Sequence, residues 1–341
     1  MRRPASSKDF EHTKKMHASV LLCCGICMLS LCVFIYMDSR DPSLDFNTRA
    51  QRAQVLPSCR FDELPVLTRH KLQGTGETRG CTSTLVTGYF DITSKHTHSV
   101  YSKWIENLAN NSRLNLCLLV FTDSPGMWFP SVEQVVINTT LCDEALALNQ
   151  SEIFWRNQWF RDPEAAAHKG FPLYLVWNLK AYFLQEATRL NPFQSEYYFW
   201  IDAGYMRSAD QAHGDARTMA PNVDKDAMHF LLIDHFSRAE LEERRRFHYT
   251  VGQDRLGGGM FGGHVSAVVP WVQLYYQTLG TYVARGWFVG KDQNIMNTLC
   301  IENPTACVLL DPNVWVMENP WFKMWECLFG QRHCSVVHTT V

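Results

Sequence analysis

The sequence predicts an α/β fold, in which a mixed, mostly parallel sheet is covered by helices on both faces. Short apolar runs, rich in β-branched and aromatic residues, alternate along the chain with segments of helical periodicity. The runs contain few polar residues, which is typical of strands buried on both faces. Three of the runs end at a carboxylate, and ligands collect at such strand ends in sheets of this class.

The first predicted element is a membrane anchor. Residues 18–37 contain no charged residue and are long enough to cross a bilayer as a helix. Residues 1–17 are rich in Lys and Arg, so we expect this tail to stay cytoplasmic in a single-pass type II arrangement. The alternative is a cleaved signal peptide, which the long polar leader and the lack of a small-x-small motif after Met37 disfavour.

Residues 38–80 are predicted to form a luminal stem, and residues 81–341 one folded domain. The stem is polar, contains several Pro and Gly residues, and is almost free of aromatic residues. The cysteines beyond the anchor are even in number, which allows disulfides in an oxidising compartment. Spacing does not settle the connectivity, but two close pairs are the simplest to join: Cys300/Cys307 and Cys327/Cys334.

Composition narrows the range of partners. With 32 basic against 34 acidic residues and no basic stripe interleaved with aromatic residues, nothing indicates a nucleic-acid partner. The aromatic content of 13% is enough for a substantial core. Three acceptor sequons fit a glycoprotein of the ER or Golgi lumen: Asn110, Asn138 and Asn149.

The first half of the domain is predicted to contain three strands and a helix. Residues 82–90 are apolar and β-branched and end at a carboxylate, as expected of a buried strand. Residues 101–108 have helical periodicity. Residues 115–121 form a second buried run that ends near a carboxylate, and residues 134–137 a third, short one.

The second half is predicted to continue the alternation. Residues 172–190 form a long helix, because a proline suits its first position, apolar residues recur at helical spacing, and Asn191-Pro192 ends the pattern. Residues 197–201 and 228–233 are apolar strands. A Ser-x-x-Glu capping box then begins a charged helix over residues 237–247.

Asp202 is the most telling candidate site residue. The strand Tyr197–Ile201 is wholly apolar and leads directly into this carboxylate and a glycine-containing turn. An ionised carboxylate beside so much apolar surface is costly unless a cation or hydrogen bonds compensate it. A divalent metal ion that bridges two phosphates would do so. The alternative is that Asp202 caps the next turn.

A glycine-rich stretch is the second candidate. Leu256–Gly263 places five glycines in eight positions, and glycine lets a ligand approach the backbone closely. The stretch matches neither GxGxxG nor the P-loop pattern, so it is not identified as a phosphate loop. The alternative is a flexible turn.

Three further residues carry candidate chemistry, each with a simpler alternative. Lys180 lies in an apolar helical stretch, from which it either reaches a diphosphate or only extends to solvent. Asp292 is either a site residue or the N-cap of the helix that follows, and the isolated motif favours the N-cap. His338 is either a metal ligand or a tail residue without a role.

Together these motifs resemble the HtrL/YibB family over residues 82–338, in the expected order. That family in turn resembles the GT-A-type glycosyltransferases, which use nucleotide-diphosphate sugars, and this implies a GT-A-like (Rossmann-like) sheet. The resemblance rests on six segments: Thr84–Asp91, Leu119–Asp123, Asn178–Lys180, Trp200–Gly204, Gly258–Gly263 and Asp292–Gln293.

The resemblance implies where a nucleotide would bind. Thr87, Tyr89 and Asp91, at the end of the first strand, would lie under the base and the ribose. Asp123 would lie near the base. Lys180 would approach the diphosphate from its helix.

The resemblance also implies a metal and a sugar subsite. Asp202 takes the place of the metal-binding acidic motif, and His338 would be a second ligand of a Mn²⁺ or Mg²⁺ ion. Asp292 would contact the transferred sugar or act as a base, with Gln293 beside it. Four glycines would form the floor under the sugar: Gly258, Gly259, Gly262 and Gly263.

This chain differs from the GT-A enzymes at one motif, and the difference leaves two functional hypotheses open. Where GT-A enzymes have Asp-x-Asp, this chain has Asp202-Ala203-Gly204, so the second acid is absent. The expected function is a Golgi or ER glycosyltransferase that transfers a sugar from a nucleotide-diphosphate sugar to a glycan, lipid or protein. The rival is a non-catalytic, membrane-tethered module that binds a glycan or a partner. A metal-dependent hydrolase would need more clustered His and Asp ligands.

Overall fold

The computed structural model describes residues 80–110, 114–128, 134–211, 214–217, 223–243, 253–313, 319–330, 332–337 and 339. The expected cytoplasmic tail, anchor and stem lie outside these residues, apart from Gly80. The chain divides into two compact units, of which Met1–Ala53 is not described and Gln54–Val341 contains every described element. Across the described ranges, none of the helices combines the length and apolarity of a membrane span.

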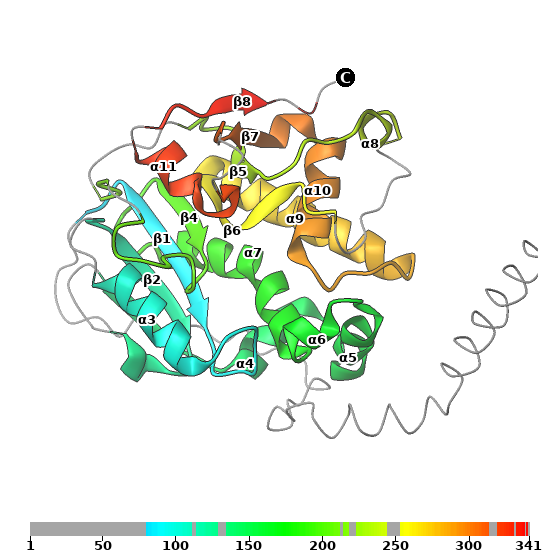
Figure 1. Ribbon diagram of the computed structural model, residues 1–341, viewed down its shortest axis with the longest axis horizontal. Coiled ribbons are helices and arrows are strands. Elements are labelled where there is room, and N and C mark those ends of the chain that lie inside the picture. Colours follow the sequence, from blue (N-terminus) through cyan, green and yellow to red (C-terminus); the bar gives the residue numbers. More distant parts are fainter. Residues whose placement is uncertain are drawn as a thin grey trace, which may run out of the picture. The chain divides into compact units, whose positions relative to one another are not determined.

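Eight strands form one mixed sheet (Figure 1): β1 Ser83–Tyr89, β2 Cys117–Thr122, β3 Gln134–Asn138, β4 Tyr197–Ile201, β5 Met228–Leu232, β6 Leu256–His264, β7 Cys307–Asp311 and β8 Ser335–Val337. The order across the sheet is β3-β2-β1-β4-β6-β5-β7-β8. β1, β2, β3 and β4 are parallel to one another, and β5 is parallel to β7. β6 and β8 run antiparallel to their neighbours. The predicted α/β class with a mostly parallel sheet is confirmed.

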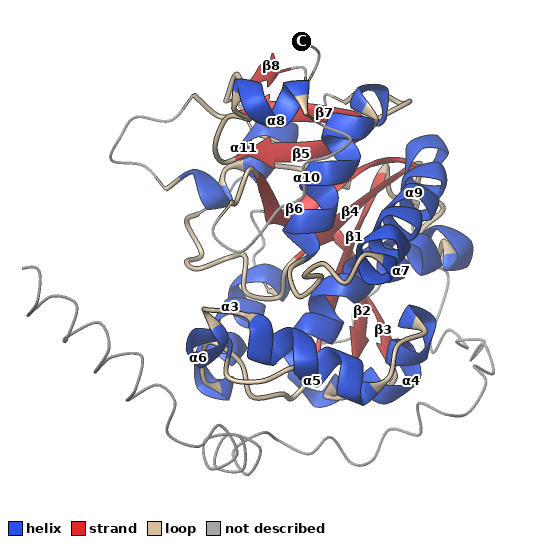
Figure 2. Ribbon diagram, turned by 90° about the vertical axis from the view of Figure 1, so that its right-hand side faces the viewer, coloured by secondary structure: helices blue, strands red, loops and turns tan. Residues whose placement is uncertain are grey.

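The longer helices flank this sheet, as the turned view shows (Figure 2). The helices are α3 His98–Ala109, α4 Leu141–Ala145, α5 Glu152–Arg161, α6 Ala165–His168, α7 Pro172–Leu190, α8 Arg238–Glu242, α9 Val265–Ala284, α10 Asp292–Glu302 and α11 Met324–Leu328, with a short 3₁₀ turn, η4, at Pro320–Phe322. α7 contacts β1 and β4, while α9 contacts β4, β5 and β6.

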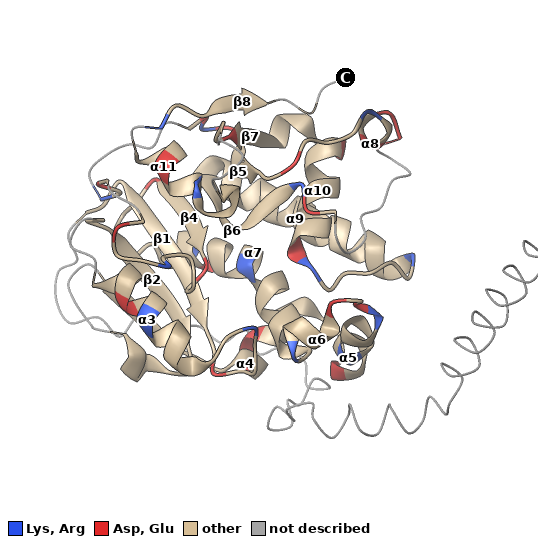
Figure 3. Ribbon diagram, viewed as in Figure 1, with Lys and Arg blue, Asp and Glu red and all other residues tan. Residues whose placement is uncertain are grey.

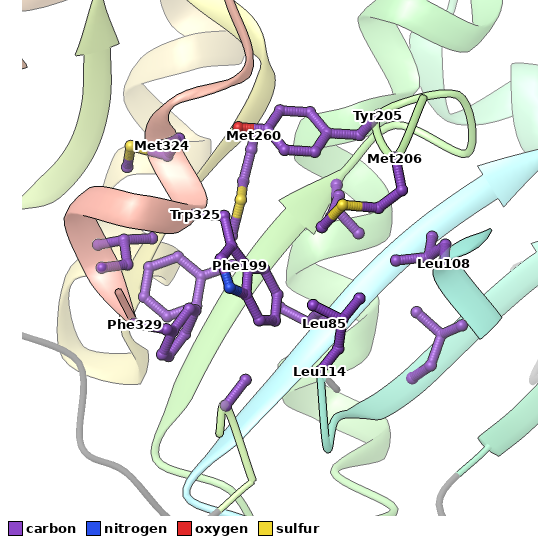
Figure 4. Close-up of a cluster of buried hydrophobic side chains, with 14 of the residues drawn as sticks. Leu85, Leu108, Leu114, Phe199, Tyr205, Met206, Met260, Met324, Trp325 and Phe329 are labelled. Carbon is purple, nitrogen blue, oxygen red and sulfur yellow. The ribbon is translucent and has the colours of Figure 1, made fainter. Parts of the chain in front are cut away.

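One face of the sheet carries a large hydrophobic cluster (Figure 4). Leu85 and Phe199 point to this face from neighbouring strands, since side chains alternate along a strand. Leu108 reaches them from α3, and Trp325 and Phe329 from α11 and the residue after it. The cluster closes this face with residues that lie far apart in the sequence.

The opposite face is packed by aromatic rings from α7 and α9. Phe183 of α7 stacks with Phe121 of β2 and Trp200 of β4, with ring centroids 4.6 and 6.1 Å apart. Trp271 of α9 packs against Phe230 of β5 at 5.5 Å. Helices therefore cover both faces, as the uninterrupted apolar strands predicted.

The glycine-rich stretch forms a strand, so the alternative of a flexible turn is wrong. Leu256–His264 is strand β6, which pairs with β4 on one side and β5 on the other. A Cβ on Gly262 would lie 2.1 Å from the Tyr198 carbonyl oxygen, so the close approach of β4 requires glycine there. Because glycine has no side chain, β4 and β6 can approach each other closely here.

Two further local expectations need correction. The helix opened by the capping box of Ser237 and Glu240 is present but spans only Arg238–Glu242, and residues 244–252 are not described. Asp292 is not an N-cap, because the N-cap position is Lys291 and Asp292 is the first residue of α10. That position frees its side chain for other contacts.

Three disulfides join described cysteines. Cys300–Cys307 and Cys327–Cys334 confirm the two pairs that close spacing favoured. Cys81–Cys117 links the amino-terminal ends of β1 and β2, a pair 36 residues apart that spacing did not indicate.

Charge is nearly absent from the sheet (Figure 3). In the described strands, Asp311 at the end of β7 is the one Asp, Glu, Lys or Arg residue. Charged groups close to the sheet therefore come from helices and from the residues that follow strand ends.

Candidate functional site

The strand order creates a switch point between β1 and β4. From β1 the chain continues to β2 and β3 on one side, and it later returns to β4 on the other side of β1. In open α/β sheets a ligand crevice forms beyond the carboxyl ends of two such strands. A cavity of about 350 Å³ lies at this place, lined by residues from the ends of β1 and β4. Its size is within the range of small-molecule sites.

Lys180 lies at the centre of the charged groups of this cavity. Its ammonium Nζ lies 3.0 Å from Asp202 Oδ1 and 3.0 Å from Asp292 Oδ2. It also donates a hydrogen bond of 2.8 Å to the carbonyl oxygen of Gly258. Three of the expected site residues and one of the expected glycines therefore meet at one atom.

Asp202 is positioned by the end of β4 and the start of β6. Because β6 is antiparallel to β4, its first residues lie at the carboxyl end of β4, and the Asp202 N–H donates to the Gly259 carbonyl at 2.8 Å. The indole N–H of Trp200 donates to Asp202 Oδ1 at 2.7 Å. The carboxylate is thus held by the strand that delivers it.

Asp292 is positioned by the first turn of α10. Its Oδ1 accepts from the Gln293 backbone N–H at 3.0 Å, and the Gln293 side chain donates to the Leu256 carbonyl at 2.6 Å. Burial raises the pKa of Asp292, and the nearby Lys180 offsets only part of that effect. For Lys180, burial favours the neutral amine, but Asp202 and Asp292 outweigh it and raise the pKa of the ammonium. Lys180 is therefore charged at neutral pH.

The two carboxylates differ in access to solvent. The side chains of Lys180 and Asp292 are each 4% exposed, whereas that of Asp202 is 39% exposed. Asp202 is therefore the carboxylate that a ligand in the cavity can contact most directly. Asp292 also lines the cavity, but it is almost fully buried and pairs with Lys180.

The expected glycine floor divides into two parts. Gly258 and Gly259 line the cavity, and a Cβ on Gly258 would lie 3.0 Å from Asp292 Oδ2. Gly262 and Gly263 do not line it. A Cβ on Gly263 would lie 2.8 Å from the Ala227 carbonyl oxygen, so this pair serves the contact with neighbouring strands.

The residues expected around a nucleotide are only partly gathered at the cavity. Tyr89 lines it, and its hydroxyl contacts His98 Nδ1 at 3.0 Å. Thr87 is fully buried in β1 and does not line the cavity. Asp91 and Asp123 are exposed outside the lining, where the Asp91 N–H donates to Asp123 Oδ1 at 3.0 Å.

Several lining residues were missed by the sequence analysis. They are cationic or aromatic side chains that follow the ends of β1 and β4 or lie on α3, α7 and η4: Lys95, His96, Tyr101, Trp177, Arg207, Trp321 and Phe322. The position of Lys95 and Arg207 shortly after strand ends could have indicated that they belong to the site. The rings come from helices, where an aromatic residue is more simply explained by core packing.

The described residues alone do not fit a divalent cation in the cavity. The Lys180 ammonium already fills the space between the two carboxylates, and Asp202 Oδ1 also accepts from Trp200. His338 lies outside the described residues, so the Mn²⁺ or Mg²⁺ site of Asp202 and His338 stays a prediction.

Another cluster with metal-ligating groups lies outside the cavity lining. Among the described residues, Asp162, Glu164 and His168 bring ligand atoms within 4.8 Å of one another. His168 Nδ1 and the Tyr174 hydroxyl already share Asp162 Oδ2. Lys291 Nζ lies 2.7 Å from Glu164 Oε2, so this cluster is satisfied without an ion.

Fold and site together define an α/β protein with a cavity lined by charged residues at the switch point of its sheet. The chain belongs to the HtrL_YibB family, because the family model described as "Bacterial protein of unknown function (HtrL_YibB)" matches residues 137–328. No curated protein matches it. The matched region contains Lys180, Asp202, Gly258 and Asp292 but not β1 or β2.

Proposed function

We propose that this protein is a GT-A-like glycosyltransferase that transfers a sugar from a nucleotide-diphosphate sugar to an acceptor hydroxyl. One observation carries the proposal: Lys180 joins Asp202 and Asp292 in a cavity beyond the carboxyl ends of β1 and β4. Nucleotides bind at such switch points, and a cavity with carboxylates and cations can serve both a hydroxyl and a diphosphate. In this proposal the domain faces the Golgi or ER lumen from a type II anchor at residues 18–37.

The proposed reaction requires one bond to form and one to break. The acceptor oxygen bonds to the anomeric carbon, while the bond from that carbon to the diphosphate oxygen breaks and leaves its electron pair on the diphosphate. A carboxylate takes the hydroxyl proton. Asp202 suits this step better than Asp292, because it is far more exposed to the cavity. Cationic side chains stabilise the departing diphosphate.

A second candidate function is binding without turnover. It is favoured by Ala203 and Gly204, which leave Asp202 without the second acid of the Asp-x-Asp pattern. A protein of this kind would hold a nucleotide sugar or a glycan in the same cavity without breaking the glycosidic bond.

The full-length chain, purified in detergent, tests the proposal when it is offered a panel of nucleotide sugars with Mn²⁺ or with EDTA. We expect release of nucleoside diphosphate, and a fall of at least 100-fold in Asp202→Asn. Asp311→Asn is the matched control, because Asp311 also ends a strand but does not line the cavity. Its rate should equal that of the wild type.

Thermal melting and binding of the nucleotide sugar accompany the rate measurements, so that loss of folding is recognised. Binding without release by the wild type would establish the second candidate. Release that survives Asp202→Asn in a folded variant would show that this carboxylate does not take part.

A further inference from the structure

The cavity contains more cations than its carboxylates require. Its lining residues include Lys95, Lys180 and Arg207, against Asp202 and Asp292. His96 also lines it, but burial, followed by Arg207 and other nearby cations, lowers the pKa of its imidazole, so it is neutral at neutral pH. The lining thus has one net positive charge, and this excess can attract an anion.

Lys180 cannot supply this attraction to a ligand. An ammonium has three N–H donors, and three acceptors surround Nζ: Asp202 Oδ1, Asp292 Oδ2 and the Gly258 carbonyl oxygen. With its side chain only 4% exposed and its charge paired with two carboxylates, Lys180 is poorly placed to bind a phosphate. The resemblance implies that Lys180 contacts the diphosphate, but other residues must make that contact.

Arg207 is held by aromatic rings instead of by carboxylates. Its guanidinium carbon lies 3.5 Å from the ring centroid of Trp104 and 5.2 Å from that of Phe322. Within the part of the chain that the structure describes, no carboxylate lies within ion-pair distance of it. A guanidinium whose faces are covered by rings keeps its edge donors, which match two phosphate oxygens in a fork.

Lys95 is held in the same manner. Its ammonium lies 5.2 Å from the ring centroid of Trp177, and no ion pair joins it to a carboxylate of the described residues. Lys95 follows the end of β1, and Arg207 follows the end of β4. The carboxylate of Asp202 interacts electrostatically with both, and all three residues line the same cavity.

We propose that Lys95 and Arg207 form an anion subsite that takes the two phosphate groups of a diphosphate ligand, while Lys180 acts only as a positioning residue for the two carboxylates. This inference rests on the proposed function for its ligand class. It explains how the cavity neutralises a diphosphate without the second acid that would hold a metal ion: side-chain cations face the phosphates directly.

Binding of inorganic pyrophosphate to the full-length chain in detergent, in EDTA, tests the subsite by calorimetry. We expect Lys95→Gln and Arg207→Gln each to raise the Kd at least ten-fold. Two matched controls remove ring-stacked cations outside the cavity: Arg285→Gln, 4.6 Å from the Trp287 ring, and Lys225→Gln, 6.0 Å from the Tyr197 ring. Their Kd should stay within two-fold of the wild type.

The outcomes separate this inference from the proposed function. Pyrophosphate that fails to bind in EDTA, or that binds equally to all four variants, would overturn the anion subsite even if nucleotide sugars are turned over. Binding that depends on Lys95 and Arg207 would support the subsite even if no sugar nucleotide is hydrolysed. Melting temperatures equal to that of the wild type would confirm that the variants are folded.

Discussion

At the scale of single residues, the chemistry of Lys180 depends on how completely its donors are used. A charged amine that is buried and bonded to two carboxylates and a carbonyl is fixed in place. It in turn keeps two negative charges close together, which would otherwise repel each other in a region of low dielectric. We therefore regard it as a structural cation that positions the two carboxylates.

Replacing Lys180 by Met is expected to reduce the free energy of unfolding by about 3–5 kcal/mol, because Asp292 then becomes a buried charge without a partner. Chemical denaturation of the two proteins at pH 7 measures the difference. Lys103→Met is the control, since Lys103 pairs with Glu106 on the exposed face of α3 and such pairs contribute less than about 1 kcal/mol. Equal stabilities for the two variants would contradict the structural role.

His229 makes stability depend on pH. Burial lowers the pKa of this imidazole to about 4, and its Nε2 accepts from the Asp224 N–H at 3.0 Å. The unfolded chain binds a proton near pH 6.5, whereas the folded one does so only near pH 4. The free energy of unfolding therefore has its full contribution from neutral His229 above pH 6.5, and this contribution decreases as the pH falls towards 4.

When the pH is lowered from 7.5 to 5.0, the free energy of unfolding should fall by about 2 kcal/mol more in the wild type than in His229→Gln. The glutamine keeps an acceptor for the Asp224 N–H but does not titrate. Denaturation curves at the two pH values give both losses. Other groups titrate alike in the two proteins, so equal losses would mean that His229 is not responsible.

At the scale of elements, five strands and the helix α7 were predicted from the sequence, whereas β6, β7, β8 and the helix α9 were not. The strand Tyr197–Ile201 and the helix Pro172–Leu190 have the predicted bounds, because an apolar run and a helical repeat are local signals. β6 consists mainly of glycine, whose local preference favours turns. This segment is a strand because it pairs with β4 and β5, and such pairing is a tertiary effect that local sequence does not reveal.

Gly262→Ala should therefore be severely destabilising, by about 3 kcal/mol or more, because its Cβ would overlap the backbone of β4. Gly280→Ala, near the carboxyl end of α9, is the matched control. Nothing lies within 4 Å of a Cβ there, and alanine should stabilise the helix by up to about 1 kcal/mol. Thermal denaturation of both variants measures the contrast, and similar effects at the two positions would refute the packing argument.

The same distinction applies to the site. Asp202 could be predicted because a carboxylate at the end of an apolar strand is a local anomaly. Arg207 could not, because its importance comes from the rings of Trp104 and Phe322, which lie on separate elements. Asp292 was favoured as an N-cap, because the sequence alone does not reveal that Lys180 lies opposite it.

At the scale of the whole molecule, the disulfides and the sequons bear on the compartment in which the domain folds. Disulfides persist where the environment is oxidising, and three join described cysteines. The three sequon asparagines, Asn110, Asn138 and Asn149, are all exposed, so a glycosylation enzyme could reach each of them.

If the domain is luminal, the protein made in animal cells should migrate faster on a denaturing gel after treatment with a peptide N-glycosidase. The triple variant Asn110→Gln/Asn138→Gln/Asn149→Gln should show no such shift. A wild-type protein whose mobility does not change with the enzyme would argue against the type II orientation.

The meeting of four elements at Lys180 also has a consequence for biosynthesis. α7, β4, β6 and α10 leave the ribosome in that order, and α10 supplies the last of the three oxygen partners. Until α10 has been synthesised, Lys180 and Asp202 lack the partner that Asp292 provides. A nascent or truncated chain therefore cannot form the complete cavity. Competence to take up a ligand is thus acquired only late in translation, when nearly the whole polypeptide is available to fold.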